Sequence, residues 1–499
     1  MSYDVIIVAN CMTLRSHTVK MLEEFERAGG KVIFMGRLPY LVDARPDERA
    51  AALTVGQTVI PQSKDALYRA VAEYRDVEIR DKNGARTKGL MCNTRRDGNG
   101  RWLFLAHMYK PELAHLVTPE QISIKVKGNY HPYIYDTLSG DVKDVSFVAD
   151  GEYTTIYTTL YDLDTLLVRY EDMAEPMSFT LDSAPTDYVE IKHPSVVDYK
   201  LSEDNVLVLD MANYSLDGEA LSDLTEEVMR IDAKVRQRLG YQSRKVKFVQ
   251  PWTITGEPED HVLKLKYTIK SDVKISGARL AMENPHKAKI VFNGKGVSNI
   301  ANGYYADREI KTLALPTIKK GINTLEITMP FGLRTDLEAC YIIGKFGTAY
   351  KGREAYITEI PEKLHFGSVV HQGFAFYGAN VEYKAEINLD SPSDLEVTVS
   401  QYRGAIVGVA LDGVDKGRIA YPPFRLNLAG VPAGKHEITY TLYGTRYNTF
   451  SALHNLNASK KRIYIGPIYW RSEDEAWAYE YQTRPMGILK TPVVKARKK

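Results

Sequence analysis

The sequence predicts a mainly β fold that begins with a short α/β segment. Two apolar runs in the first 36 residues flank one amphipathic helix, which is the pattern of buried parallel strands joined by a helix. From about residue 77 onward, apolar and polar residues alternate, as they do in half-buried strands. The chain also contains 33 tyrosines against 14 phenylalanines and 4 tryptophans, and aromatic side chains favour strands.

The charge balance and the cysteines narrow the class of protein. Across 499 residues, 65 Lys and Arg face 63 Asp and Glu, which argues against a nucleic-acid partner bound by bulk positive charge. No apolar run reaches the roughly 18 residues of a membrane span, and residues 1–8 lack the features of a signal peptide. We therefore expect a cytoplasmic protein without a membrane partner.

Cys11, Cys92 and Cys340 are too few and too far apart to predict disulfides or a zinc site.

Residues 1–76 make up the predicted α/β segment. Residues 3–9 predict a strand buried on both faces, 18–28 a helix that ends at two glycines, and 31–36 a second buried strand. A further helix is predicted over about 63–74. A parallel sheet of only two or three strands leaves an edge or a face uncovered, so we expect this segment to need a partner chain or a different packing.

The remaining chain divides into β-rich modules. Alternation and the turns at 81–84 and 97–100 predict an antiparallel β-sandwich over 77–180. Spaced apolar residues predict one inserted amphipathic helix at about 216–240. We expect two further modules and then a frayed basic tail. These cover residues 181–350, 351–489 and 490–499.

Two stretches of the later modules share one order of features. Each has a strand that runs into an Asn-Gly or Asp-Gly turn, then an aromatic loop, a strand led by glycine, and a Gly-x-Arg sequence. This order predicts two copies of one β-sandwich. The copies extend over residues 288–334 and 407–446.

Several segments resemble large bacterial glycoside hydrolases. Residues 3–16 and 25–36 are similar to the end of the flavodoxin-like domain that follows the catalytic barrel in α-L-rhamnosidase-like and β-galactosidase-like enzymes. The repeat resembles the galactose-binding-like jelly roll of family-2 glycoside hydrolases, in which a strand ending in Asn-Gly precedes a Gly-x-Asn strand. That pattern occurs at 290–294 and 321–327. The closing stretches that resemble the terminus of these enzymes are 447–455, 466–470 and 479–488.

The resemblance implies the C-terminal half of such an enzyme without its catalytic barrel. The expected fold class is mainly β, with a truncated flavodoxin-like α/β segment followed by a β-sandwich and two galactose-binding-like jelly rolls. The resemblance places the acid and base carboxylates on the barrel. Because the sequence shows no eightfold βα alternation, we assign no catalytic residue and leave open whether the chain is an enzyme.

Three functions remain open at this point. The first is an accessory, noncatalytic part of a rhamnosidase-like glycoside hydrolase, which supports a barrel and contacts carbohydrate. The second is a glycoside hydrolase that is active only in complex with a barrel-bearing chain. The third is a ligand-free scaffold or oligomerisation protein. The corresponding partners are a carbohydrate or glycoside, a barrel-bearing chain, or further copies of this chain.

Candidate carbohydrate-binding residues combine aromatic rings with planar polar groups, because sugars present apolar faces and paired hydroxyls. Trp477, Tyr479 and Tyr481 alternate and are predicted to share one face of a strand. The alternative is that these aromatic side chains pack the sandwiches or an interface between modules. The candidates are Asn302, Tyr304, Tyr305, Asp307, Arg334, Glu338, Tyr421, Arg446, Asn448, Trp470 and Trp477.

No cofactor is expected from the sequence, and a structural calcium ion is the single metal considered. The histidines show no spacing typical of metal ligands, so no metal-binding residue is assigned. One group of carboxylates has the ligand type that calcium prefers, without the spacing of an EF-hand. Its members are Asp204, Asp210, Asp217 and Glu219.

Overall fold

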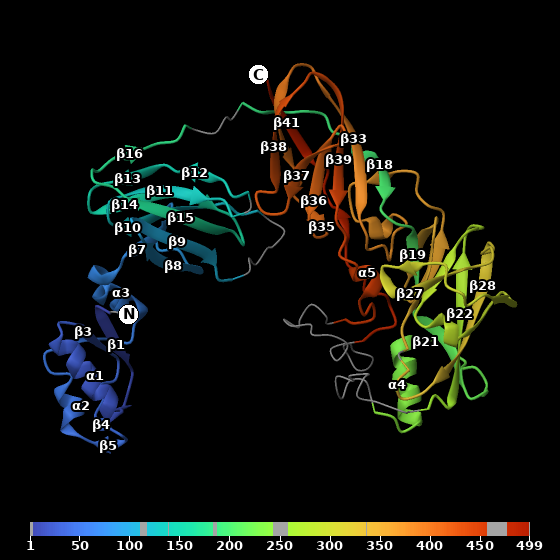
Figure 1. Cartoon of the computed structure of the whole chain (residues 1–499), viewed down its shortest axis with the longest axis horizontal. Coiled ribbons are helices and arrows are strands. Elements are labelled where there is room, and N and C mark those ends of the chain that lie inside the picture. The colour runs from blue at the N-terminus through green and yellow to red at the C-terminus, as the bar shows by residue number, and fades with distance from the viewer. Residues whose placement is uncertain are drawn as a thin grey trace. The chain divides into compact units, whose positions relative to one another are not determined.

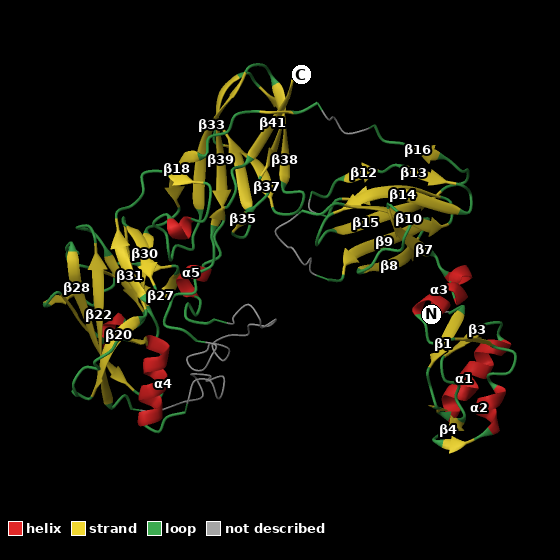
Figure 2. Ribbon diagram, turned by 180° about the vertical axis from the view of Figure 1, so that it is seen from behind, coloured by secondary structure: helices red, strands yellow, loops and turns green. Residues whose placement is uncertain are grey.

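A computed structural model describes residues 3–109, 117–137, 139–182, 187–242, 258–335, 337–456 and 477–498. The chain consists of two compact units, Met1–Ala184 and Pro185–Lys499. Strands predominate in both units, and helices are few and short (Figures 1 and 2). The predicted mainly β fold class with an α/β segment at its start is therefore confirmed.

The α/β segment contains a three-stranded parallel sheet in the order β1-β3-β6. Helix α1 covers it, and Val19 and Leu22 of the helix pack with Val32 and Phe34 of β3. The predicted strand–helix–strand unit is confirmed, and β6 is the third of the two or three strands expected. The bounds are β1 (Val5–Ala9), α1 (Ser16–Arg27), β3 (Lys31–Met35), β6 (Thr58–Ile60), and, around them, β2 (Thr13–Leu14), β4 (Leu41–Val42), β5 (Arg45–Pro46), α2 (Glu48–Ala52) and α3 (Lys64–Ala70).

Strand β1 differs from its prediction. It was expected to be buried on both faces, but it lies at the edge of the sheet and pairs only with β3 among the described strands. None of its residues is fully buried, and Ile7 is 39% exposed. Only β3, the middle strand, is covered on both faces, because the sheet contains too few strands to enclose β1.

The rest of the first unit is an antiparallel β-sandwich of two five-stranded sheets. Their orders are β16-β13-β14-β10-β7 and β12-β11-β15-β9-β8, and the predicted hairpin with a turn at 97–100 is β8–β9. Alternate residues such as Leu103, Ile124 and Val168 are fully buried between the sheets. The bounds are β7 (Val77–Asp81), β8 (Leu90–Asp97), β9 (Gly100–His107), β10 (Glu120–Lys127), β11 (Tyr130–Tyr135), β12 (Val142–Asp144), β13 (Phe147–Ala149), β14 (Tyr153–Leu160), β15 (Thr165–Asp172) and β16 (Ser178–Phe179).

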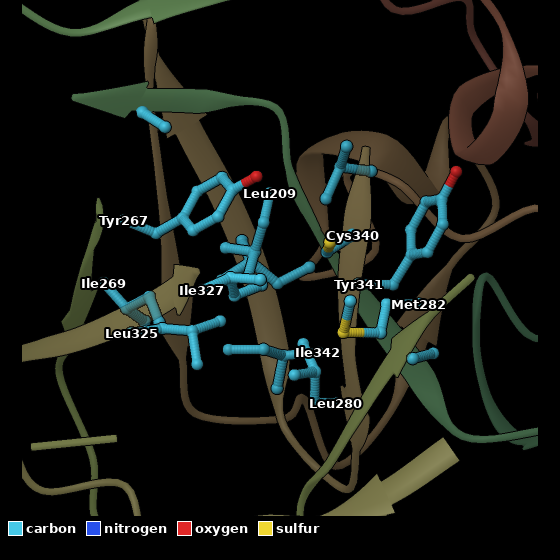
Figure 3. Packing of buried hydrophobic residues seen from close by; sticks show 14 of the residues in the cluster. Leu209, Tyr267, Ile269, Leu280, Met282, Leu325, Ile327, Cys340, Tyr341 and Ile342 are labelled. Carbon is cyan, nitrogen blue, oxygen red and sulfur yellow. The ribbon is translucent and has the colours of Figure 1, made fainter. Parts of the chain in front are cut away.

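The second unit contains two further sandwiches, here called the first and the second sandwich. The first sandwich pairs the sheet β21-β20-β22-β28-β24-β25 with the sheet β19-β29-β23-β27-β26. Its core includes Tyr267, Leu280, Ile327 and Cys340 from facing strands (Figure 3). The bounds are β19 (Asn205–Leu209), β20 (Met211–Leu216), β21 (Glu226–Glu227), β22 (His261–Ser271), β23 (Arg279–Met282), β24 (Lys289–Phe292), β25 (Lys295–Val297), β26 (Tyr304–Tyr305), β27 (Asp307–Ala314), β28 (Gly321–Phe331), β29 (Cys340–Gly344), β30 (Gly347–Lys351) and β31 (Glu354–Thr358).

The second sandwich pairs the sheet β32-β18-β33-β39-β36-β37 with the sheet β17-β41-β34-β38. A separate two-stranded sheet joins β35 and β40. The bounds are β17 (Val189–Glu190), β18 (Val196–Leu201), β32 (Leu364–His365), β33 (Val381–Leu389), β34 (Ser393–Thr398), β35 (Tyr402–Arg403), β36 (Val407–Leu411), β37 (Val414–Ile419), β38 (Arg425–Val431), β39 (Gly434–Leu442), α5 (Tyr447–Phe450), β40 (Gly487–Ile488) and β41 (Val493–Lys498).

The two sandwiches have equivalent strand orders, as the repeat in the sequence predicts. Strands β20, β22, β28, β24 and β25 correspond in order and pairing to β18, β33, β39, β36 and β37. The two predicted turns match in detail. Asn293 and Asp412 have φ of 50°, and the side-chain Oδ1 atoms accept hydrogen bonds from the main-chain nitrogens of Thr324 (2.8 Å) and Glu437 (2.9 Å).

The sheets divide the second unit differently from the consecutive modules expected over 181–350 and 351–489. The second sandwich takes β17 and β18 from before the first sandwich and its other strands from after it. The first sandwich is therefore nested within the second along the chain. The basic tail expected over 490–499 is also wrong, because β41 lies between β17 and β34 and is a central strand of its sheet.

Helix α4 (Val228–Arg238) is the one long helix that the structure describes in the second unit. It ends before Gly240, as predicted, but it begins twelve residues after the predicted start at 216. The carboxylate of Glu227 caps it by accepting a hydrogen bond from the Arg230 nitrogen at 3.0 Å. Val228, Ile231 and Val235 form its buried face, whereas Leu224 is 71% exposed, so the apolar spacing upstream of the cap was misleading.

Candidate carbohydrate site

The candidate site is a pocket of about 120 Å³ where loops meet at one end of the first sandwich, here called the loop-end pocket. The strand ends around it are the start of β22, the end of β23, the end of β28 and the start of β29. Two residues predicted from the sequence, Arg334 and Glu338, line it together. Its other polar residues are Glu259, Glu283, Asn284, Lys287 and Thr335.

The loop that carries Arg334 is held in place by helix α4. The guanidinium of Arg236 donates hydrogen bonds to the main-chain oxygens of Leu333 at 3.0 Å and Thr335 at 2.6 Å. Asp232, one turn earlier on α4, orients the guanidinium through hydrogen bonds from Arg236 Nε at 3.1 and 2.9 Å. The loop closes on itself because Thr335 Oγ1 accepts a hydrogen bond from the Gly332 nitrogen. The position of Arg334 therefore depends on a buried ion pair.

The pocket combines charged groups with an apolar floor. Lys287 holds the carboxylate of Glu259 at 2.8 and 3.0 Å at one side, and Asn284 turns the β23–β24 loop with a φ of 47°. Met282, Met329 and Pro330 provide the apolar surface. A guanidinium and several carboxylates around a small cavity suit paired hydroxyl groups, because both are planar and can form two parallel hydrogen bonds. The volume lies below the roughly 300–1,000 Å³ of pockets for drug-sized ligands, so a single sugar unit is the expected scale.

A second group of polar side chains is buried near the start of helix α4. The Tyr481 hydroxyl donates a hydrogen bond to Asp210 Oδ1 at 2.6 Å, and His454 Nε2 lies 3.4 Å from Asp210 Oδ2. The other imidazole nitrogen of His454 donates to the Ala478 carbonyl oxygen at 2.9 Å. Glu227, which caps α4, lies close enough to Asp210 and His454 to interact with their charges. These four side chains, Asp210, Glu227, His454 and Tyr481, are here called the buried acid cluster, and each is 4–7% exposed.

Burial shifts the acid–base properties of this cluster. The pKa of Glu227 is raised to about 7, mainly by desolvation; the nearby charge of His454 opposes this rise, and the Asp210 carboxylate adds to it. Desolvation lowers the pKa of His454, but the hydrogen bond and charge of Asp210 outweigh it and leave that pKa raised. The cluster can therefore hold and release a proton near neutral pH. The sequence analysis considered Asp210 for calcium and Tyr481 for sugar binding, but it did not predict that these side chains form a cluster with Glu227 and His454. The one signal in the sequence was a glutamate directly before an amphipathic helix.

The remaining candidates of the first repeat are spread over its surface and core. Asn302 is exposed and accepts a hydrogen bond from Thr312 Oγ1 at 2.9 Å, and Asp307 turns its own loop by accepting one from the Glu309 nitrogen. Tyr304 is 58% exposed, whereas its neighbour Tyr305 is 5% exposed and packs in the core. The structure therefore does not bring these residues to the loop-end pocket.

Arg446 and Asn448 of the second repeat have structural partners. The Arg446 guanidinium forms a two-pronged ion pair with the carboxylate of Glu203, in the link between β18 and β19. Its carbon lies 5.8 Å from the centre of the Tyr305 ring, so Arg446 connects the two sandwiches. Asn448 is buried and forms two hydrogen bonds of 2.8 Å with the main chain of Arg484.

The predicted aromatic candidates do not form one face of a strand. Trp477 takes part only in an isolated bridge, and Tyr481 turns inward to Asp210. Trp477 packs edge-on against Tyr479 at 4.5 Å, with the Arg230 guanidinium 4.1 Å from its ring centre. Tyr421 is 57% exposed and does not line the loop-end pocket. Trp470 lies outside the described residues.

The four carboxylates considered for calcium do not come together. Asp204 pairs with Arg279 at 3.0 Å and Asp217 with His261 at 2.8 Å. Asp210 belongs to the buried acid cluster, and Glu219 binds Arg238. Among the residues that the structure describes, no three His, Cys, Asp or Glu side chains gather as a metal-binding group. In the same part of the chain, no helix combines the length and the apolar character needed to cross a membrane.

Glycoside hydrolases are among the solved structures to which this chain is similar. No protein-family model and no curated protein sequence matches it. The rhamnosidase from Novosphingobium sp. PP1Y is similar over 97% of this chain and 33% of its own, with 11% identity and a TM-score of 0.44. The Streptomyces avermitilis alpha-L-rhamnosidase complexed with L-rhamnose is similar over 83% and 38%, with 12% identity and a TM-score of 0.24.

A beta-galacturonidase from Eisenbergiella tayi bound to galacturonate is similar over 50% of this chain and 37% of its own, at 11% identity and a TM-score of 0.18. The chain thus spans about a third of the length of the solved structures that it matches. Its structural neighbours among these are glycoside hydrolases of low sequence identity.

Proposed function

We propose that this chain is an accessory, noncatalytic part of a rhamnosidase-like glycoside hydrolase that binds a carbohydrate unit at the loop-end pocket. The observation that carries the proposal is the meeting of Arg334 and Glu338 in one small pocket on a sandwich of repeated topology. Pockets between loops at the end of a rigid sandwich are typical positions for binding residues, since the strands hold the loops in place.

The polar groups of the pocket match the chemistry of a sugar. The Arg334 guanidinium offers two parallel donors, and the carboxylates of Glu338 and Glu283 offer acceptors for hydroxyl hydrogens. Met282 and Met329 provide apolar contact for the C–H face of a ring. Because the residues come from three different loops of one sandwich, binding would need no movement of a second module.

Calorimetry on the full chain tests the proposal. L-rhamnose, D-galactose and D-galacturonate are titrated separately, and we expect at least one of them to bind with a dissociation constant of about 1 mM or lower. Arg334→Ala and Glu338→Gln should each weaken that binding about tenfold, which corresponds to loss of roughly 1.4 kcal/mol. Arg308→Ala, an exposed arginine outside the pocket, is the matched control and should bind as the wild type does. Absence of binding for all three sugars, or binding by Arg334→Ala and Glu338→Gln that equals the wild type, would contradict the proposal.

One observation favours the second candidate, a glycoside hydrolase that is active only with a barrel-bearing chain. Strand β1 is an apolar strand at the edge of a parallel sheet, and Tyr3 and Ile7 are 64% and 39% exposed. Parallel sheets are usually covered on both faces, so a partner chain that extends this sheet is the natural complement. Light scattering of the purified chain across a range of concentrations tests the point, since self-association through this edge would show that a second copy, and not a barrel-bearing chain, covers it.

A further inference from the structure

A groove of about 950 Å³ lies in the second sandwich, away from the loop-end pocket. One wall is the chain from Asp187 to Pro194, which includes β17, and the other is the end of β33 with the loop that follows it. The apolar side chains of Val189, Ile191 and Leu389 line it, and Val189 is 69% exposed. A groove of this size that exposes apolar side chains is typical of a binding surface.

The nested repeat shows which part of the first sandwich corresponds to this groove. In the first sandwich, Leu216 of β20 pairs with Leu263 of β22. In the second, Leu201 of β18 pairs with Val381 of β33. Eight residues further along, Ser271 pairs with Gly321 and Leu389 pairs with Gly434. The equivalent positions are therefore 263–271 on β22 and 381–389 on β33.

In the first sandwich a strand fills this place. Beyond the stretch paired with β20, the same edge of β22 pairs in parallel with β31, so that Lys270 faces Tyr356 and Ser271 faces Ile357. The Asp272 nitrogen donates a hydrogen bond to the Ile357 oxygen at 2.9 Å. The Ile357 side chain is fully buried, so β31 both completes the edge and closes the core.

In the second sandwich the equivalent edge is open. Strand β18 pairs with β33 only over residues 381–384, and no described strand pairs with residues 386–389 on that side. Since N–H groups of alternate residues point to the same edge of a strand, the register places those of Asn388 and Asp390 toward the groove. They correspond to those of Lys270 and Asp272, which face β31 in the first sandwich.

We propose that the groove binds an extended segment of a partner protein, which adds a parallel strand to β33 as β31 does to β22. Strand addition of this kind uses main-chain hydrogen bonds for affinity and apolar side chains for specificity. The segment would place a β-branched or aromatic residue where Ile357 lies in the first sandwich. This inference depends on the repeat and on the groove, and it stands or falls separately from carbohydrate binding.

The charges around the groove indicate a basic segment. Four carboxylates line it against two lysines, and one of the four, Glu386, is paired with Lys435 at 3.1 Å. A segment with Lys or Arg at its exposed positions would complement the remaining acidic groups. The charged residues of the groove are Asp187, Glu190, Lys192, Glu386, Asp390 and Lys498.

A peptide based on the natural strand of the first sandwich provides the probe. A fluorescein-labelled synthetic peptide with the sequence of residues 351–359, in which both glutamates are replaced by lysine, is titrated with the full-length chain and followed by anisotropy. We expect saturable binding with a dissociation constant on the order of 10–100 μM. A scrambled peptide of the same composition should bind at least about tenfold more weakly.

Two kinds of variant distinguish binding in the groove from nonspecific binding of the peptide. Asn388→Pro removes the N–H that faces the groove, and the double variant Glu190→Lys with Asp390→Lys reverses the charge without touching the strand backbone. Each should weaken binding at least about tenfold. Glu382→Lys, on the same strand within the stretch paired with β18, is the matched control and should bind as the wild type does. Circular dichroism confirms that each variant is folded.

Three results would overturn the proposal. The first is no saturable binding of the peptide to the wild-type chain. The second is binding that the folded charge-reversal variant retains in full. The third is self-association of the wild-type chain that the same variants abolish, because the groove would then be an interface between copies of this chain and not a site for a different partner.

Discussion

Arg236 and Asp232 form an ion pair inside the protein, with 2.9 Å between Arg236 Nε and Asp232 Oδ2. Both side chains are nearly inaccessible to solvent, at 5% and 3% exposure. The same guanidinium holds the main chain of Leu333 and Thr335 on either side of Arg334. One buried pair therefore links the stability of the first sandwich to the geometry of the loop-end pocket.

Replacing Arg236 should destabilise the protein far more than replacing a surface arginine. Arg236→Ala leaves the Asp232 carboxylate buried without its partner, so we expect the free energy of unfolding to fall by about 3–5 kcal/mol. Arg238→Ala, whose ion pair with Glu219 is exposed, should cost less than about 1 kcal/mol. Urea unfolding measures both. Similar small losses for the two variants would show that the buried pair is not important for stability.

Glu227 should make stability depend on pH. Its folded-state pKa of about 7 lies above its ordinary value of 4.5, so the folded protein holds this proton more tightly than the unfolded chain does. The stabilising contribution is therefore complete below pH 4.5 and is lost as pH rises through 7. A shift of this size corresponds to about 3 kcal/mol.

Glu227→Gln, which keeps a neutral side chain of the same shape, isolates this effect. We expect the wild type to lose about 3 kcal/mol relative to this variant between pH 4.5 and pH 8 in urea unfolding. Glu219→Gln, at an exposed ion pair, should show no such divergence in this range. Parallel pH profiles for the wild type and Glu227→Gln would mean that Glu227 is ionised in the folded protein.

The last strand should be essential for the second sandwich. Deleting residues 490–499 removes β41 from between β17 and β34, and we expect the second sandwich to lose its resistance to limited proteolysis. Val494→Asp, which places a carboxylate at a fully buried position of β41, should cost more than about 3 kcal/mol. Lys490→Ala, outside the strand, serves as the control. Unchanged proteolysis of the deletion variant would restore the idea of a dispensable tail.

The matched turns of the two sandwiches should respond alike to substitution. Asn293→Ala and Asp412→Ala each remove a side-chain hydrogen bond to the next long strand, and each should lower the free energy of unfolding by about 1–2 kcal/mol. Asp412 also holds Nδ1 of His436 at 2.6 Å, which raises the pKa of that histidine. The loss in Asp412→Ala should therefore be larger at pH 6 than at pH 9, whereas Asn293→Ala should show no such dependence.

Much of the fold follows from short-range patterns. The first helix, the β8–β9 hairpin and the two Asx-Gly turns were predicted because each is encoded by a few adjacent residues. The nesting of the sandwiches and the central place of β41 were not, because strand pairing across hundreds of residues leaves no local signal. Five basic residues in the last ten suggested a solvated tail, but two of them, Lys495 and Arg497, alternate with Val494 and Ala496, which face the core.

The candidate site was predictable only in part. Arg334 and Glu338 were nominated from the repeat and lie in one pocket. Arg446 and Asn448 were nominated in the same way, but Arg446 connects the two sandwiches and Asn448 binds the main chain of Arg484. Residue type indicates that a side chain can bind a sugar. It does not show whether the polar groups of that side chain are already bound to another part of the protein. The Asp232–Arg236 pair had a visible signal in its spacing of four residues on a helix.

Nesting one sandwich within the other also imposes an order on biosynthesis. As the chain leaves the ribosome, the first sandwich has all its strands once residue 358 has emerged, and it can fold while translation continues. Strands β17 and β18 are made earlier, but β18 must wait for β33, and β17 must wait until residues 493–498 are available. During that interval their unpaired edges are exposed. A translational pause or a missing chaperone would therefore cause the second sandwich to misfold more readily than the first.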